Sequence, residues 1–434
     1  MSVDATGLFL PAGFVPLQVV DVDGEQHVLV ETERVPVGCP SCGAVARVKD
    51  RRTVTVRDLP VAETPRVLRW RKRVFECRYT LCEAKTWTET HEAIAPRAVL
   101  TERARQWAFV QVGGHDRAVS AVAGQLGVAW HTIFTQVKLR GQPLIEDPVR
   151  LTGVRALGVD ETSFLRATGR HPSVYATGIA DLTPGRPPRL SDVVRGRSGA
   201  VLGDWLNARD DAWRAAIGTA SLDPFRGYAT ALSTHLPDAV RVLDAFHVVK
   251  LALQAVDDIR RRVQQSTTGH RGHRDDPLYR ARRILRRRAD RMTSKQIARL
   301  TAALAAGDPN DELAAGWLVA QGLMAAYANQ DRATGRAAAV NLITTAKTCP
   351  VPEIAKLGRT LHAWRTEFLA RFDHPDVSNG PTENLNLKIK NTKRIARGYR
   401  NFNNYRLRLL LNHGLTWQDQ QPTRIRTRRP RLAA

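Results

Sequence analysis

The sequence is poor in acidic residues. It holds 42 Asp and Glu against 66 Lys and Arg in 434 residues, which gives a net charge of +24 and a pI near 10.7. A folded protein with this excess of cations is attracted to a polyanion, and nucleic acid is the usual one. The cations are spread over the whole chain, which favours a large basic surface over a single charged tail.

Long apolar runs are also lacking. No stretch is long enough to cross a bilayer, and the start MSVDATGLFLPAGFVPLQVV has neither the basic segment nor the clean apolar segment of a signal peptide. The composition is otherwise that of a folded protein, at 43% hydrophobic and 25% charged. We therefore expect a soluble, cytoplasmic protein associated with the nucleoid, with no membrane partner and about two to four domains.

Only five cysteines are present, and four of them fall into one pattern. Cys39 and Cys42 form one close pair, Cys77 and Cys82 form another, and Cys349 stands alone. Two close pairs of thiolates are typical of one tetrahedral structural zinc, although buried cysteines without a ligand are the alternative. The alternating stretches RRTVTVRDLP and PRVLRWRKRVFEC predict a hairpin that brings the two pairs together.

A helix-turn-helix pattern follows the cysteines. In DRAVSAVAGQLGVAWHTIFTQVKLRG, apolar residues recur at helical spacing on both sides of Gly127, which predicts two brief helices. The predicted buried faces are Ala121, Val122 and Leu126 in the first helix, and Ile133, Phe134 and Val137 in the second. Any helical hairpin can show this spacing, but in so basic a chain we favour DNA binding. The residues expected to face a major groove are Trp130, His131, Thr132 and Gln136.

From residue 154 the pattern changes to that of an α/β domain. The segments VRALGVDETSF, SVYATGIADL and RLSDVVRG predict three strands, and SGAVLGDWLNA predicts a helix capped by Ser198. GTASLD, PFRGYATALSTHL and AVRVLDAFHVV then predict a strand, a helix and a strand before a long helix. The order β-β-β-α-β-α-β-α is that of the RNase H-like fold, a mixed sheet with an antiparallel start.

This fold would bring two aspartates together. Asp160 and Asp223 end strands that neighbour each other, about 4.8 Å apart, so their carboxylates can share a divalent cation. Asp244 ends the next strand out, at about twice that distance, and we rank it behind Asp223. Glu161 points to the other face of its strand and is a weaker candidate than Asp160. For any one of these aspartates, a turn or cap role is the simpler explanation.

A single acid stands in a strongly basic stretch of the chain. In NGPTENLNLKIKNTKRIARGYRNF the acid is Glu383, and the next acid downstream is Asp419. Its basic companions are Lys388, Lys390, Lys393, Arg394, Arg397 and Arg400. The Gly-Pro start places Glu383 in the first turn of a helix, where a carboxylate is favoured by the helix dipole. The alternative to this preference is a metal ligand held beside a polyanion.

If Glu383 is a metal ligand, the basic residues around it also have a function. With 3.6 residues per turn, Lys390 and Arg394 lie within about 40° of Glu383, so they can hold phosphates beside it. Asp160, Asp223 and Glu383 together suit two Mg²⁺ or Mn²⁺ ions that activate water or a 3′-hydroxyl. The cations expected to contact DNA are Lys388, Lys390, Arg394 and Arg397.

The longest motifs carry a family resemblance. LGVDETSF, SLDPFRGYATAL…PDAVRVLDAFHVVK and SNGPTENLNLKIKNTKRIARGYRNFNNYRLRLL resemble bacterial insertion-sequence transposases with the DDE catalytic set, of the ISL-three type. The CPSCG…CRYTLC ribbon and the helix-turn-helix resemble that family's front end. The resemblance implies that Asp160, Asp223 and Glu383 are the catalytic acids. DAFH is similar to a D-x-x-H signature, which implies accessory positions near the site for Asp244 and His247.

The resemblance implies a DNA transposase that binds its element's ends and carries out strand cleavage and transfer into target double-stranded DNA, as a homodimer or larger assembly. The fold expected is multidomain α/β: an RNase H-like mixed-sheet core with an all-helical insertion, preceded by a zinc ribbon and a helix-turn-helix. The expected boundaries are 1–92 for the zinc ribbon, 93–148 for the helix-turn-helix, 149–262 and 361–418 for the core, 263–360 for the insertion, and 419–434 for a basic disordered tail.

Other classes of protein remain as alternatives. A non-catalytic DNA-binding regulator, or an inactivated transposase remnant, would share the front end, but it would have no use for a glutamate at position 383. A tyrosine or serine recombinase is disfavoured because no nucleophile stands in the arginine and histidine setting that it needs. A nuclease of RNase H type does not explain two DNA-binding modules ahead of the core.

Overall fold

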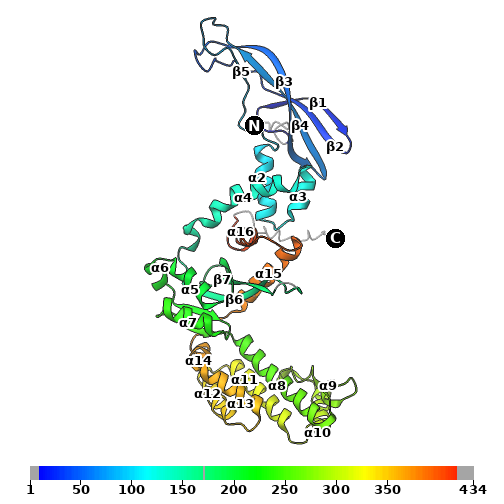
Figure 1. Ribbon diagram of the computed structural model, residues 1–434, viewed down its shortest axis with the longest axis vertical. Coiled ribbons are helices and arrows are strands. Elements are labelled where there is room, and N and C mark those ends of the chain that lie inside the picture. The colour runs from blue at the N-terminus through cyan, green and yellow to red at the C-terminus, as the bar shows by residue number, and fades with distance from the viewer. Residues whose placement is uncertain (1–8, 170–171, 418–434) are drawn as a thin grey trace, which may run out of the picture. The chain divides into compact units, whose positions relative to one another are not determined.

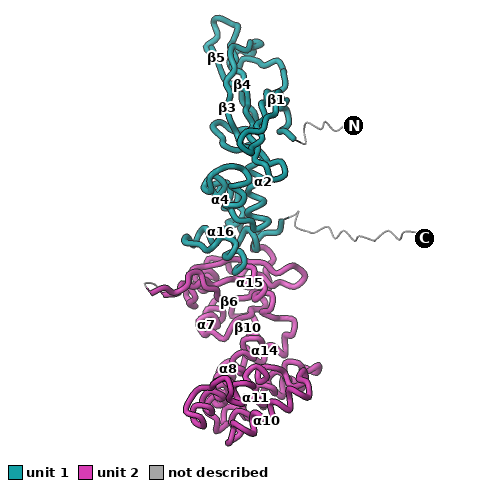
Figure 2. The backbone as a smooth tube through the Cα atoms, turned by 90° about the vertical axis from the view of Figure 1, so that its right-hand side faces the viewer, with its two compact units in different colours: residues 1–150, 389–434 teal, residues 151–388 magenta. Residues whose placement is uncertain are grey.

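The computed structural model describes residues 9–169 and 172–417. The chain forms two compact units, one of residues 1–150 and 389–434 and one of residues 151–388 (Figure 2). The basic tail expected at 419–434 lies outside the described residues. Over the described ranges, no helix has the length and apolar character that crossing a membrane requires.

The first unit begins with a β-sheet in the strand order β1-β2-β4-β3, with the short β5 paired to β4 (Figure 1). The strands are β1 (Phe14–Val22), β2 (Glu25–Thr32), β3 (Arg47–Val61), β4 (Thr64–Glu76) and β5 (Thr86–Thr88). β3 and β4 pair antiparallel, so the predicted hairpin is confirmed. Phe14, Val30, Leu68 and Trp70 are buried and form the centre of this sheet's core.

Helices follow the sheet in the same unit. They are α2 (Glu102–Gly113), α3 (Val119–Leu126), α4 (Trp130–Glu146) and, from the end of the chain, α16 (Phe402–His413). Gly127 ends α3 with φ +63, a left-handed conformation that favours glycine, so the predicted turn is confirmed. Ile133, Phe134 and Val137 are buried as predicted.

The prediction for the first of these two helices is wrong at one residue. Ala121 is exposed and Ala123 is buried, because the buried face follows the i, i+3, i+4, i+7 spacing from Val119 through Val122 to Leu126. The second helix, α4, is also longer than expected, at 17 residues.

The second unit contains the mixed sheet, in the strand order β10-β9-β6-β7-β8. β6, β7 and β8 are antiparallel neighbours, whereas β9 and β10 run parallel to β6, so the predicted fold class is confirmed. The structure adds one short helix, α6, before β9. The short helix η1 (Pro148–Leu151) spans the boundary between the two units in the sequence. The elements that follow it are β6 (Ala156–Leu165), β7 (Val174–Asp181), β8 (Arg189–Arg195), α5 (Gly199–Asn207), α6 (Asp211–Ala215), β9 (Thr219–Leu222), α7 (Arg226–His235) and β10 (Val240–Leu243).

A helical segment is inserted between β10 and the helix of Glu383, as expected. Its first helix, α8, starts immediately after Asp244 and is 24 residues long. Buried apolar residues run without a break from the sheet into these helices, for example from Leu243 through Val248 and Ile259 to Phe368. The elements are α8 (Ala245–Thr268), α9 (Pro277–Ala281), η2 (Ala289–Arg291), α10 (Ser294–Gly307), α11 (Glu312–Ala328), α12 (Arg332–Lys347), α13 (Pro352–Ala363) and α14 (Arg365–Asp373), followed by α15 (Gly380–Ile395).

Candidate functional site: an acidic cluster on the mixed sheet

Three aspartates lie on three neighbouring parallel strands or directly after them. Asp223 follows β9 and Asp244 follows β10, whereas Asp160 lies within β6, which continues to Leu165, so the expectation that Asp160 ends its strand was wrong. β9 lies between β6 and β10, and Leu222 of β9 is in register with Val159 on one side and with Leu243 on the other. The next residue along each strand is therefore Asp160, Asp223 or Asp244, all at the same level of the sheet. The carboxyl ends of parallel strands are where α/β proteins usually place their ligands.

His247 connects two of these aspartates. Its Nδ1 lies 2.9 Å from Asp223 and 2.8 Å from Asp244, and its backbone N–H donates to the Asp244 carboxylate that caps α8. Burial opposes protonation of the imidazole, but the hydrogen bonds to both carboxylates outweigh it and raise the pKa of His247 to about 10. The imidazole is therefore positively charged at neutral pH.

Asp244 also lies close to Asp223. Its strand β10 is next to β9 and one farther from β6, as expected, and its carboxylate approaches Asp223 at His247. Ligand atoms of Asp223, Asp244 and His247 all lie within 4.8 Å of one another.

Asp160 is buried beside Asp223. One of its carboxylate oxygens accepts the N–H of Glu161 at 2.6 Å, and the other accepts the side-chain amide of Asn386. Burial, and then the negative charge of Asp223, raise the pKa of Asp160 to about 7. Glu161 is exposed and pairs with Arg197 at 3.6 Å, as expected of the opposite face of the strand.

Glu383 reaches the same cluster from α15. It lies in the first turn of that helix, as predicted, and burial together with the charge of Asp244 raises its pKa. Gly158 of β6 allows the helix to begin here, since a Cβ at this position would overlap the Thr382 hydroxyl. The acids predicted from the sequence, Asp160, Asp223 and Glu383, therefore lie around one site together with Asp244.

Two asparagines of this site were missed from the sequence. Asn379 is fully buried, accepts the Ser221 hydroxyl at 2.8 Å, and directs its amide toward Asp223 at 3.5 Å. Asn386 is bonded to Asp160. The available signal was spacing: Asn386 follows Glu383 by three residues, so a helix places both on one face.

On the catalytic role that the family resemblance implies for Asp160, we expect Asn386→Ala to lower DNA strand cleavage by about 10- to 100-fold, the usual effect of removing a partner that orients a metal ligand. The amide fixes the Asp160 carboxylate, which would otherwise rotate. The matched control is Asn391→Ala, an exposed asparagine of the same helix, which should cleave like the wild type. Equal rates for all three proteins in a gel-based cleavage assay would contradict this role.

The four cysteines of the first unit also form a cluster. The Sγ atoms of Cys39 and Cys82 are 3.6 Å apart, those of Cys42 and Cys77 are 3.5 Å apart, and all four lie within 4.8 Å of one another. A tetrahedral zinc with Zn–S bonds of about 2.3 Å would separate its sulfurs by about 3.8 Å. The cluster therefore fits a closed, structural zinc site.

The side chains predicted to face DNA are exposed to different degrees. Trp130 and His131 are exposed, whereas Thr132 and Gln136 are partly buried. The Trp130 ring stacks on Phe134 of the same helix at 4.7 Å between centroids. The four cations predicted to contact DNA from α15 and the residues just after it are all exposed: Lys388, Lys390, Arg394 and Arg397.

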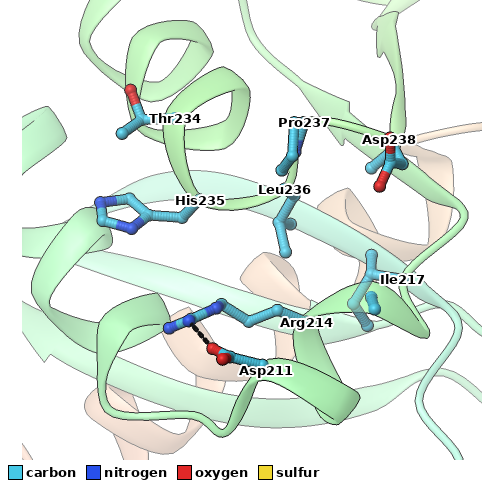
Figure 3. Close-up of a pocket in the computed structure, with 10 residues that line it drawn as sticks. Asp211, Arg214, Ile217, Thr234, His235, Leu236, Pro237 and Asp238 are labelled. Atoms are coloured by element: carbon cyan, nitrogen blue, oxygen red, sulfur yellow. Dashed lines mark hydrogen bonds and ion pairs between the residues drawn. The ribbon is translucent and has the colours of Figure 1, made fainter.

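A separate pocket of about 280 Å³ lies at the other edge of the mixed sheet (Figure 3). It is lined by residues of α6, by the end of α7 at His235 and by Asp238 of the loop that follows, and it contains the ion pair of Asp211 and Arg214. Its lining residues Ile217 and Ala239 precede β9 and β10, so it opens at the amino ends of these strands. None of the acids predicted from the sequence lines it.

Models of known protein families match the regions of the chain that contain the acidic cluster and the cysteine cluster. The transposase family model of ISL3 matches residues 157–409, more than half of the chain. The chain belongs to the ISL3 transposase family. Two further models of this family match, the zinc finger of the IS204, IS1001, IS1096 and IS1165 transposases at residues 36–82 and the ISL3 helix-turn-helix at residues 89–134. The family resemblance found in the sequence is confirmed, and the zinc-finger match coincides with the cysteine cluster.

Individual proteins that are similar to this chain are also named as transposases. The transposase for insertion sequence element IS1557 of Mycobacterium tuberculosis is 28% identical over 301 residues, which is 65% of this chain and 65% of that protein. The transposase for element IS1001 of Bordetella parapertussis is 28% identical over 371 residues, 83% of this ISL3 chain and 85% of its own. A Drosophila P element transposase in a strand transfer complex has a TM-score of 0.40 and 9% identity over 71% of this chain and 91% of that one.

Proposed function

We propose that this ISL3 family member is an active DNA transposase that cuts DNA strands at the ends of its own element and joins them to target DNA. The observation that carries the proposal is that Asp160 lies beside Asp223, and that Asp244 and Asp223 are near enough to Glu383 for their charges to raise its pKa. Asp160 lies within β6, Asp223 follows the adjacent parallel strand β9, and Glu383 comes from a helix about 160 residues farther along the chain. Bringing such distant acids together is what a site for divalent cations requires.

The residues of this site suit Mg²⁺ or Mn²⁺. Carboxylate oxygens are the ligands that these hard cations prefer, and the raised pKa of Asp160 reflects negative charge gathered in a buried place. Asp160, Asp223 and Glu383 would hold the cations. When bound, such cations supply Lewis acidity that activates water or a 3′-hydroxyl and stabilises the leaving oxygen of the phosphodiester.

The protein's other residues would position these acids. Asn386 holds the Asp160 carboxylate and Asn379 faces Asp223, so neither acid has to be ordered when DNA arrives. His247 bonds to Asp223 and Asp244, which limits the motion of both carboxylates. We assign Asp244 and His247 this positioning role, and we assign the metal-binding role to Asp223.

Recognition of the element's ends falls to the first unit in this proposal. The zinc ribbon and α3–α4 form the DNA-binding front end, and the cations Lys388, Lys390, Arg394 and Arg397 would contact phosphates. Since two ends must be cut and joined in concert, we propose that at least two copies of the chain assemble on DNA.

Replacing Thr132 and Gln136 together by alanine should weaken binding to the element's ends by about 10- to 100-fold for each base contact that is lost, because one good base contact contributes about 1–3 kcal/mol. Binding to unrelated DNA of the same length should change little, because phosphate contacts carry no sequence information. A competition mobility-shift assay measures both. An equal loss on both DNAs would show that α4 does not read bases.

Strand cleavage and strand transfer on DNA that carries the element's own ends, with Mg²⁺ or Mn²⁺, test the proposed function. The expected result is metal-dependent cutting at the ends, followed by joining to target DNA. Tight binding of the ends with no cutting in either metal would instead identify a regulator or an inactivated transposase remnant.

A further inference from the structure

The helical segment between the strands and α15 has a strong concentration of positive charge. Residues 260–299 include fourteen Lys and Arg but only three Asp, so this stretch of forty residues contributes eleven of the chain's net +24. An exposed helix often carries many charges, but usually of both signs. A segment in which cations outnumber acids so strongly needs an explanation other than solubility.

Many of these arginines line one cavity. A pocket of about 430 Å³ opens where the second half of α8 faces α9 and the residues that follow it. Leu253, Val256 and Leu285 give it an apolar floor, and Asp257 is its one acid among the described residues. The guanidinium groups around it are those of Arg260, Arg261, Arg271, Arg282, Arg283 and Arg286. We call this set of residues the arginine pocket.

Part of the arginine pocket is fixed in place. Arg260 is only 4% exposed, and its Nε donates to Asp257 at 2.9 Å. The Arg282 guanidinium lies 3.9 Å from the centre of the Tyr279 ring, and its Nη1 donates to the Tyr279 carbonyl at 2.7 Å. Gly272, with φ +122, lets the loop after α8 pass close to this tyrosine. These contacts give the pocket a definite shape.

Three arginines at the pocket have no counter-charge. Arg271, Arg283 and Arg286 are exposed, and within the described part of the chain no carboxylate or hydrogen-bond acceptor pairs with their guanidinium groups. A guanidinium presents its donors in a planar fork that matches a phosphate. The three free cations therefore converge on a cavity whose walls already carry fixed positive charge.

We propose that the arginine pocket binds phosphate groups, and that these belong to a DNA backbone. The choice of DNA rests on the proposed function, which brings the chain to DNA as its substrate. Contacts to phosphates add affinity regardless of sequence, so the pocket would hold DNA without recognising the element's ends. A solvated arginine run would require neither the cavity nor the buried Arg260.

The test is the salt dependence of DNA binding by the full chain with Arg271→Ser, Arg283→Ser and Arg286→Ser combined. Each phosphate contact contributes about 0.9 to the slope of log K against log salt concentration, so losing three should lower the slope by about 2 to 3. The control combines Arg332→Ser, Lys356→Ser and Arg359→Ser, three exposed cations of α12 and α13 outside the pocket. It removes the same charge and should leave the slope near that of the wild type.

The outcomes separate the pocket from the proposed function. Equal slopes for the two triple variants would overturn the pocket proposal, whether or not the wild type cuts DNA. A lower slope for the pocket variant alone supports the pocket even if the wild type never cuts, in which case only the proposed function fails. Binding of inorganic triphosphate that the pocket variant loses, with an unchanged DNA slope, would identify a free polyphosphate as the ligand and overturn the assignment to DNA.

Discussion

Asp160→Asn, Asp223→Asn and Glu383→Gln should each lower the rate of DNA strand cleavage by about a thousandfold or more, a loss of about 4 kcal/mol of transition-state stabilisation. An amide keeps the shape of the carboxylate but loses the negative charge that holds a divalent cation. Binding to the element's ends should stay at the wild-type level, because these acids do not belong to the helix-turn-helix or the ribbon. Cleavage gels and mobility shifts on the same DNA measure the two properties.

Substitutions of two neighbouring acids, Glu161 and Asp244, serve as controls for these three variants. Glu161→Gln alters the exposed acid next to Asp160 and should leave cleavage intact. In our proposal Asp244 is a partner of His247 and not a metal ligand, so we expect Asp244→Asn to cause a smaller loss of about 10- to 100-fold. If Asp244→Asn abolishes cutting while Asp223→Asn still cuts, the second metal-binding acid is Asp244 and our assignment is wrong.

Removing zinc should unfold the two cysteine-bearing loops, residues 33–46 and 77–85, while the rest of the sheet stays folded. Binding of a structural zinc contributes on the order of 10 kcal/mol at neutral pH, far more than short loops gain from their own packing. The core around Trp70 contains none of the four cysteines and should persist. A strong chelator is therefore expected to release one zinc per chain, to expose both loops to protease and to weaken binding to the element's ends.

Substitution of one ligand should reproduce this effect. Cys39→Ser is expected to lose bound zinc and to show the same protease cuts. Cys349→Ser, which alters the remaining cysteine far from the cluster in sequence, should retain one zinc per chain. Full zinc content in purified Cys39→Ser, measured by elemental analysis, would rule out the four-thiolate site.

Features with a local pattern could be predicted from the sequence. The cysteine pairs, the alternating hairpin and the turn at Gly127 depend on residues near one another in the chain. The order of strands and helices in the core was also predictable, because buried strands have apolar runs that differ from helical spacing. Even so, the predicted buried face of α3 was wrong at Ala121, since a helix of eight residues, about two turns, is too short to fix its phase from sequence.

Contacts between distant segments could not be predicted in the same way. The pairing of Asn386 with Asp160 joins residues 226 positions apart, and Asn379 meets Ser221 across 158. Neither asparagine stands out in the sequence, because asparagine is common at helix starts and in turns. Their role depends on how closely α15 approaches β6 at Gly158.

The sequence by itself determined which kinds of residue were available: four thiolates in two pairs, a few acids in a basic chain, and the order of the elements that carry them. These follow from composition and short-range spacing, which chain folding does not alter. Only the tertiary structure decided that Asp223 and Asp244 converge on His247, and that Arg271, Arg283 and Arg286 converge on one cavity. The physical reason is that side chains from different elements point toward a common place only once those elements have packed, and packing depends on the whole core.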